Sequence, residues 1–157
     1  MKKLIIFGSI IVVLFGAIGF LTHYQNTQTA QGNPFGKKTL HNETVEQLDD
    51  PLYQNVILPD ELEEKLANGE DATIYFYSGR CEYCNLATPI LVPQAEEMGV
   101  DLQLFNLLEF EEGRNDYNIR ATPMVVHYEN GEEVARVEGK LEAEGYERFF
   151  EEVVLTD

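Results

Sequence analysis

The sequence predicts an α/β sandwich around a mixed β-sheet, with one apolar helix in front of it. Three observations point to this fold class. The continuous run of aromatic and branched residues at 72–78 is typical of a central strand that is buried on both faces. Strand-like and helix-like segments alternate along the chain after about residue 53. Asn130-Gly131 is a strong hairpin signal, so at least one pair of strands is expected to be antiparallel.

The composition describes one small, strongly acidic protein. Its 157 residues leave room for about one domain, and 28 Asp and Glu against 11 Lys and Arg give a formal net charge of -17. Because this charge repels phosphate, the chain is not expected to bind nucleic acid or an anionic lipid surface. We interpret the acidity as solvation of the surface rather than as a docking site for basic partners. Apolar residues make up 44% of the chain, enough to bury a core, which excludes disorder of the whole chain.

The stretch 4–21 predicts a membrane-spanning helix. It has 14 apolar residues, three Gly and one Ser, and none of its 18 positions is charged. At about 1.5 Å per residue such a helix is roughly 27 Å long, close to the hydrocarbon thickness of about 30 Å. Signal peptides carry a shorter apolar run of about 7 to 15 residues. We therefore expect residues 1–21 to be a retained anchor, with a cleaved signal peptide as the alternative.

The basic residues predict how this helix is oriented. Lys2 and Lys3 precede the run, and the next basic residue is Lys37. By the positive-inside rule, the N-terminus stays in the cytoplasm and everything after residue 21 is exported. The sequence thus predicts a single-pass protein of the cell membrane. Residues 22–52, rich in Thr, Gln, Asn and Gly, are expected to be a tether, and residues 53–157 the folded extracytoplasmic domain.

The domain is expected to begin with a strand at 55–58 and a helix at 60–68. Pro59 and the acidic residues after it have capping-box chemistry, and Asn68-Gly69 ends the helix. The central strand at 72–78 leads into a long helix at 81–98, which ends at Gly99. A second strand is expected at 100–106, followed by a polar, helical connection at 111–118.

The C-terminal part is expected to be a hairpin and a helix. The segments 124–128 and 133–138 flank Asn130-Gly131, and both of these residues tolerate the positive φ of a type I′ turn. The last helix is expected to present one apolar face to the sheet, because its apolar residues recur at helical spacing: Tyr146, Phe149, Phe150, Val153 and Val154.

The chain has two cysteines, Cys81 and Cys84, at the junction between the central strand and the long helix. A structural zinc site needs about four ligands, and the three histidines are scattered, so no metal is expected. Covalent haem attachment requires a His directly after the second cysteine, where this chain has Asn85. A structural disulfide would close a short loop and stabilise the fold weakly. A redox-active dithiol is the favoured interpretation, and the structural disulfide and the metal site are the alternatives.

The positions of the two cysteines predict different roles. At a helix N-terminus, unpaired backbone N–H groups and the positive end of the helix dipole stabilise a thiolate, so Cys81 is expected to be the attacking sulfur. Cys84 lies one turn further on and is expected to resolve a mixed disulfide between Cys81 and a client protein. Arg80 is expected to stabilise the Cys81 thiolate and Glu82 to destabilise it.

Several motifs then follow one another along the chain. Cys81-Glu82-Tyr83-Cys84 follows a strand, Pro89 lies five residues beyond the second cysteine, and 117–123 reads Tyr-Asn-Ile-Arg-Ala-Thr-Pro. The hairpin, Gly139 and the closing helix come after them. In this order the motifs resemble the thioredoxin superfamily, with its C-x-x-C pair, its helix proline and its Tyr-Gly-Ile-Arg-x-x-Pro stretch. The resemblance covers residues 53–157 and implies a thioredoxin-like three-layer sandwich, with helices on both faces of the mixed sheet.

The resemblance also implies a client-binding loop. In the family a cis-proline faces the cysteines, and the backbone of the residue before it pairs with an extended client segment. Thr122 and Pro123 are therefore expected to bind clients, and Tyr83, beside the attacking sulfur, is expected to contact them too. His127, on the first hairpin strand, is interpreted as a strand residue.

Some positions depart from thioredoxins proper. Arg80 precedes the first cysteine, Glu-Tyr separates the pair, and the chain has no Trp. Tyr75 stands where the family places a buried Asp, and Leu104 stands in place of the Lys that partners it. These departures favour a specialised exchanger, similar to the membrane-anchored thioredoxin-like proteins of Gram-positive bacteria.

The expected function is thiol-disulfide exchange on exported proteins that contain cysteines. No flavin or nicotinamide motif is visible, so no cofactor besides the Cys81–Cys84 pair is expected, and electrons pass to or from a membrane or soluble partner. The chain is expected to be a monomer. Reductant, oxidant and isomerase share these residues, so the direction of exchange stays open. The alternative is a non-catalytic accessory of the same fold, bound beside a membrane exporter.

Overall fold

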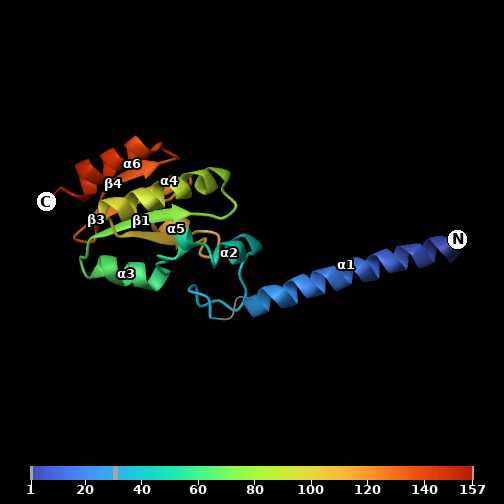
Figure 1. Ribbon diagram of the computed structural model, residues 1–157. Coiled ribbons are helices and arrows are strands. Elements are labelled where there is room, and N and C mark those ends of the chain that lie inside the picture. Colours follow the sequence, from blue (N-terminus) through green and yellow to red (C-terminus); the bar gives the residue numbers. More distant parts are fainter. Residues whose placement is uncertain (1, 30–31, 157) are drawn as a thin grey trace.

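A four-stranded mixed sheet forms the centre of the fold (Figure 1). The computed structural model describes residues 2–29 and 32–156, and within the first helix it describes the side chains of residues 6–22 and 24. The strands lie in the order β2-β1-β3-β4, with β1 and β2 parallel and the other two pairs antiparallel. Their bounds are β1 (Ala72–Tyr77), β2 (Leu102–Asn106), β3 (Met124–Glu129) and β4 (Glu132–Glu138).

Helices precede, separate and follow these strands. The long helices are α1 (Lys2–Thr29) and α4 (Glu82–Met98), and the shorter ones are α2 (Asn42–Gln47), α3 (Pro59–Ala67), α5 (Gly113–Asp116) and α6 (Ala143–Phe149). A 3₁₀ turn, η1 (Pro51–Tyr53), lies between α2 and α3, and a π-helical turn, η2 (Phe150–Val154), continues α6.

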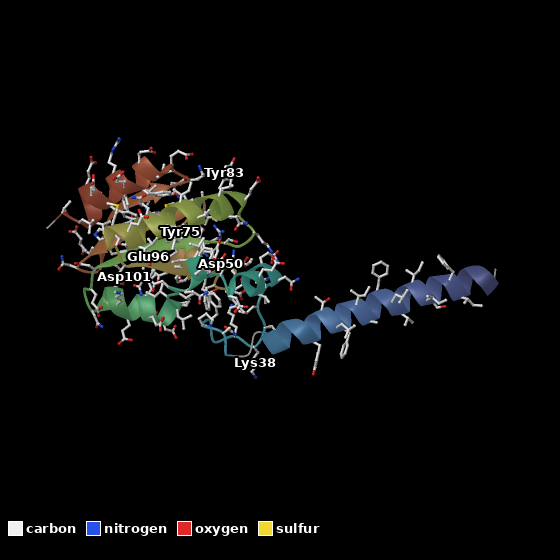
Figure 2. The ribbon with its side chains drawn as sticks, in the orientation of Figure 1. Lys38, Asp50, Tyr75, Tyr83, Glu96 and Asp101 are labelled. Atoms are coloured by element: carbon white, nitrogen blue, oxygen red, sulfur yellow. The ribbon has the colours of Figure 1, made fainter. Side chains whose placement is uncertain are left out.

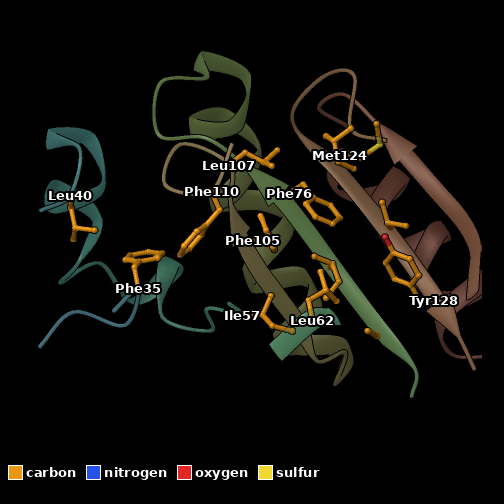
Figure 3. Packing of buried hydrophobic residues seen from close by; sticks show 14 residues of the cluster. Phe35, Leu40, Ile57, Leu62, Phe76, Phe105, Leu107, Phe110, Met124 and Tyr128 are labelled. Atoms are coloured by element: carbon orange, nitrogen blue, oxygen red, sulfur yellow. The ribbon is translucent and has the colours of Figure 1, made fainter. Parts of the chain in front are cut away.

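Two hydrophobic cores on opposite faces of the sheet make the three predicted layers. Ile74 of β1 packs in the first core with Leu62 of α3 (Figure 3). Tyr75, the next residue, points to the other face, where Leu91 of α4 and Tyr146 of α6 lie in the second core. Figure 1 shows α3 on the opposite side of the sheet from α4 and α6. The predicted α/β sandwich with a mixed sheet is therefore confirmed.

The predicted helix ends are confirmed at α3 and α4. The backbone N–H of Leu58 donates to Glu61 Oε2 at 2.9 Å, which is the half of a capping box that the N3 glutamate supplies, since the Leu58 side chain has no acceptor for the other half. Asn68 follows the last residue of α3, and Gly69 then adopts a φ of 72°. At the end of α4, Gly99 has a φ of 73°, a left-handed conformation that glycine adopts at little cost.

One predicted strand is absent from the structure, and one predicted helix is shorter. The segment 55–58 is no strand: Val56 forms an isolated parallel bridge with Leu104, and α3 begins at once with Pro59. The helical connection at 111–118 reduces to the single turn of α5 and ends before Asn118, which has a φ of 53°. The hairpin is confirmed, with Asn130 and Gly131 at φ 53° and 79°.

The first helix extends away from the sheet and its covering helices (Figure 1). Its described apolar side chains are exposed, among them Val12 at 71% and Phe15 at 73%. Among the described residues, no helix combines the length and the apolar character needed to cross a membrane. The predicted anchor begins at residue 4, and the side chains of its residues 4 and 5 are not among those described.

The segment 33–50, called the arm from here on, packs on the domain where the sequence predicted a tether. Phe35 is 6% exposed, and its ring centroid lies 6.4 Å from that of Phe110 (Figure 3). Leu40 and Thr44 are buried as well. Burial removes these side chains from water, which stabilises the docked arm. The start of the expected tether at 22–52 also differs from the structure, because α1 continues to Thr29. Residues 30 and 31 lie outside the described residues.

His127 is a buried polar residue in the middle of β3. Its Nδ1 lies 2.9 Å from Thr73 Oγ1 on the neighbouring strand, and its Nε2 lies 3.8 Å from Glu129 Oε1. Burial lowers the pKa of His127 below its usual value of 6.5, more than the nearby carboxylates raise it. The folded protein therefore favours the neutral imidazole. The interpretation of His127 as a strand residue agrees with this position.

The first prediction concerns the pH dependence of stability. The unfolded chain takes up a proton on His127 more readily than the folded chain, so the free energy of unfolding should fall as the pH drops below about 6.5. The measurement is chemical denaturation of the wild type and of His127→Gln between about pH 8 and 5. The difference in unfolding free energy between the two should change with pH across this range. A constant difference would contradict the prediction.

Candidate active site

The two cysteines lie where β1 passes into α4. β1 ends at Tyr77, and the loop 78–80 turns so that the backbone N–H of Cys81 donates to the Ser78 carbonyl at 3.0 Å. Cys81 is the N-cap of α4, and its Sγ accepts the backbone N–H of Cys84 at 3.2 Å. The sulfur of Cys81 thus satisfies one of the N–H groups that a helix start leaves unpaired. This is the position that the sequence predicted for the attacking sulfur.

The loop at Thr122 and Pro123 faces the first cysteine. The peptide bond between these two residues is cis, as the resemblance implied. Cys81 Sγ donates to the Thr122 carbonyl at 3.3 Å. Pro123 is buried, and its carbonyl accepts the backbone N–H of Gly139 at 2.8 Å, which ties the loop to the end of β4. The structure therefore brings together Cys81, Cys84, Thr122 and Pro123.

The two thiols differ in their surroundings. Both cysteines are free, Cys81 is partly exposed, and Cys84 is buried in the second core with no exposed surface. Burial, together with the nearby Cys81 side chain, raises the pKa of Cys84 to about 12. At neutral pH Cys84 therefore stays a protonated thiol, and Cys81 is the sulfur that solvent and reagents can reach.

A pair of hydroxyl groups lies beneath the first turns of α4. The Tyr75 hydroxyl lies 3.0 Å from Thr88 Oγ1 and donates to the Cys84 carbonyl at 3.3 Å. Thr88 Oγ1 donates to the same carbonyl at 2.9 Å. Burial raises the pKa of Tyr75 far above its usual value of 10, so this phenol does not act as a base at neutral pH. Tyr75, at the position where the resemblance places a buried Asp, holds the backbone around Cys84.

Arg80, expected to stabilise the Cys81 thiolate, makes its side-chain hydrogen bonds with the arm. Its Nε donates to Glu43 Oε1 at 2.9 Å, and its Nη2 donates to His41 Nδ1 at 3.2 Å. Both acceptors belong to the arm. The pKa of Glu43 is lowered, chiefly by its hydrogen bond with Arg80, so that carboxylate is charged at neutral pH. The guanidinium is therefore paired with the arm, and Glu82 lies exposed in the first turn of α4.

Two exposed apolar side chains flank the cysteines on α4. Tyr83, predicted to contact clients, is 64% exposed, and Figure 2 shows it at the surface near the start of the helix. Leu86 is 50% exposed and was not predicted. Large apolar side chains beside a partly exposed sulfur can contact an extended peptide.

Sequence reasoning missed Glu43, His41 and Thr88. Thr88 could have been found from helical spacing, because a hydroxyl four residues after Cys84 reaches its carbonyl. The arm residues carried a weaker signal: Phe35 and Leu40 are apolar residues in a polar stretch, which indicates that the segment packs on something.

Metal binding was not expected from the sequence. Within the part of the chain that the structure describes, no group of three or more His, Cys, Asp and Glu side chains forms a metal site. That the protein works without a metal or a bound cofactor stays a prediction.

The comparison with protein families decides the identity of the domain. The family model described as thioredoxin matches residues 54–152, which is more than half of the chain. This protein belongs to the thioredoxin family. Members of this family are generally disulfide oxidoreductases, and the cysteine pair of this thioredoxin-family protein lies at the junction of β1 and α4.

Solved structures of thioredoxins share the fold of this family member. Mitochondrial thioredoxin 3 of Saccharomyces cerevisiae, in its oxidised form, is 17% identical with a TM-score of 0.52, over 60% of this chain and 89% of that one. A Malassezia sympodialis thioredoxin is also 17% identical, with a TM-score of 0.53 over 63% of this chain and 88% of that one. A thioredoxin variant from Halobacterium salinarum is 22% identical, with a TM-score of 0.51 over 62% and 86%. At these identities the likeness shows the fold alone.

The second prediction concerns the reactivity of the two thiols. In the reduced, folded protein at about neutral pH, iodoacetamide should modify Cys81 and leave Cys84 unmodified, because Cys84 is buried and protonated. Peptide mass spectrometry measures the occupancy of each site, and modification of both sites after unfolding in denaturant serves as the control. Modification of Cys84 as fast as Cys81 in the folded protein would contradict the description of the site.

Proposed function

We propose that this protein catalyses thiol-disulfide exchange on exported proteins, with Cys81 as the nucleophile and Cys84 as the resolving thiol. The observation that carries the proposal is the geometry of Cys81. Cys81 is partly exposed, and its sulfur caps α4 by accepting the Cys84 N–H and lies 3.3 Å from the carbonyl of Thr122, the residue before the cis-proline. A sulfur so placed is open to a client and has its resolving partner one turn away.

In the reducing direction the exchange runs in two steps. The Cys81 thiolate attacks one sulfur of a client disulfide, a Cys81–client bond forms, and the other client sulfur leaves as a thiolate that takes up a proton. Cys84 then loses its proton and attacks Cys81 Sγ, which forms the Cys81–Cys84 disulfide and releases the second client thiol. Two electrons pass from the protein to the client, and a dithiol partner, membrane-bound or soluble, restores the reduced pair. The oxidising direction is the reverse of the same steps.

The client is proposed to lie across Thr122, Pro123 and the exposed side chain of Tyr83. Thr122 is partly exposed, so its backbone can pair with an extended segment that ends at the reacting sulfur. Tyr83 and Leu86, exposed on α4, offer apolar contact. The protein is proposed to act as a monomer, without a bound cofactor.

We further propose that the domain works outside the cytoplasm, held by residues 1–21. The apolar stretch at 4–21 and the two lysines before it support this placement. The exposure of apolar side chains along α1, such as Phe7 at 65% and Phe20 at 69%, supports a role in contact with lipid.

The third prediction tests the exchange reaction. A Cys84→Ser variant should accumulate mixed disulfides between Cys81 and client proteins, because the resolving thiol is gone. Non-reducing electrophoresis of cells expressing the full chain should show adducts that disappear with a reductant. The matched control, Cys81→Ser with Cys84→Ser, should show none.

Absence of adducts from Cys84→Ser, while Cys81 is still alkylated by iodoacetamide, would overturn the exchange proposal. Full cellular function of the variant that lacks both cysteines would do so too, and would favour a non-catalytic accessory beside an exporter.

The fourth prediction tests the placement. Native protein should stay with the membrane fraction after washes with high salt and alkaline carbonate, and detergent should release it, because an apolar helix is held by the hydrocarbon core. The mass of the released chain should include residues 1–21. A released chain that lacks them would show a cleaved signal peptide instead.

A further inference from the structure

The loop that leads into Cys81 is held from two sides. The Asn85 side chain, from α4, donates to the Gly79 carbonyl at 3.2 Å. From the other side α2 lies directly against the loop: a Cβ added at Gly79 would lie 3.0 Å from the Glu43 Cβ and 3.4 Å from the Gln47 side chain. A side chain at position 79 would therefore be crowded by the arm, and the arm is part of the surroundings of the active site.

Three contacts outside the loop keep α2 in place. The backbone N–H of His41 donates to Glu109 Oε1 at 2.9 Å, and the Glu109 side chain is 2% exposed. Lys37 Nζ donates to the backbone carbonyl of Glu109 and lies 4.4 Å from the centre of the Phe110 ring. Asn106 Nδ2 donates to Thr44 Oγ1 at 3.3 Å, and both residues are buried. The position of Glu43 is thus fixed by the fold.

Glu43 in turn holds the guanidinium of Arg80. The Nε–Oε1 distance is 2.9 Å, and His41 Nδ1 accepts a second N–H from Arg80. Arg80 is the residue directly before Cys81, so it carries the positive charge nearest to the sulfur in the sequence. Because Arg80 donates to the arm, the carboxylate of Glu43 compensates that charge, and less of its field reaches the sulfur.

We propose that Glu43 is a positioning residue for thiol-disulfide exchange: it keeps Arg80 on the arm and so limits how strongly Arg80 stabilises the Cys81 thiolate. The proposal rests on the proposed function, in which Cys81 is the nucleophile. It assigns a role to the arm, a segment that precedes the region matched by the thioredoxin family model.

The fifth prediction compares Glu43→Gln with Glu46→Gln. Both changes remove one negative charge from α2, but Glu46 is exposed and only Glu43 contacts Arg80. Glu43→Gln should speed alkylation of Cys81 by iodoacetamide about two- to fivefold at mildly acidic pH, the size expected for an exposed charge pair. Glu46→Gln should change the rate by less. The gain should shrink at high salt, which screens exposed charges. Thermal unfolding of each full-length variant checks that it folds.

A second pair of variants tests whether Glu43 acts through Arg80. Arg80→Gln alone, at an exposed position, should slow alkylation by about two- to fivefold, since Glu43 is then left uncompensated. When Glu43→Gln is added to the Arg80→Gln variant, it should change the alkylation rate by a different factor from the one it gives in the wild type. Equal alkylation rates for Glu43→Gln and Glu46→Gln would overturn the proposal. It would also be overturned if Glu43→Gln changed the rate by the same factor with Arg80 present and with Arg80 replaced.

The alkylation rate separates this proposal from the proposed function. It reports the thiolate of Cys81 directly and needs no client. If Cys84→Ser captures no client but the Glu43 and Arg80 variants change the rate as expected, exchange on clients fails and the positioning role stands. If clients are captured but the Glu43 and Arg80 variants leave the alkylation rate unchanged, only the positioning role of Glu43 is wrong.

Discussion

The active site depends on one hydrogen bond at the start of α4, from the backbone N–H of Cys84 to the sulfur of Cys81. Because sulfur takes the place of a capping oxygen, the residue that caps the helix is also the more accessible cysteine. The same bond fixes where α4 begins relative to β1, and from that start the helix period turns the next cysteine into the core. The exposed and the buried thiol follow from one helix boundary.

Burial separates the two thiols, and the tyrosines of β1 make that burial possible. Tyr75 and Tyr77 lie under α4, with ring centroids 5.6 Å apart, and Tyr53 packs on Tyr77 at 5.3 Å. Tyr75 stands where the resemblance places a buried Asp, so a neutral hydroxyl lies beneath the second cysteine in place of a carboxylate. A thiolate on Cys84 would meet little compensating charge there, so Cys84 keeps its proton at neutral pH.

Local sequence patterns predicted the parts of this site that local physics determines. The apolar run of β1, the cysteine spacing and Asn130-Gly131 each act over a few residues, and the structure has the elements they predicted. The arm could not be predicted in this way. Glu43 and Arg80 are 37 positions apart in the sequence, and nothing local distinguishes a polar segment that docks from one that does not. The strand expected at 55–58 does not form, because α3 begins at Pro59. Only one isolated bridge, between Val56 and Leu104, is present in that segment.

The docked arm is synthesised before the surface on which it packs. Its residues leave the ribosome early, yet the surface that receives them, Asn106 to Phe110, is made 62 to 75 residues later. Contacts that join such distant segments form after local ones, since they close a long loop. The surface that receives the arm must therefore be in place before the arm can pack against the loop that leads to Cys81. The surroundings of Cys81 are thus complete only once these later residues have folded.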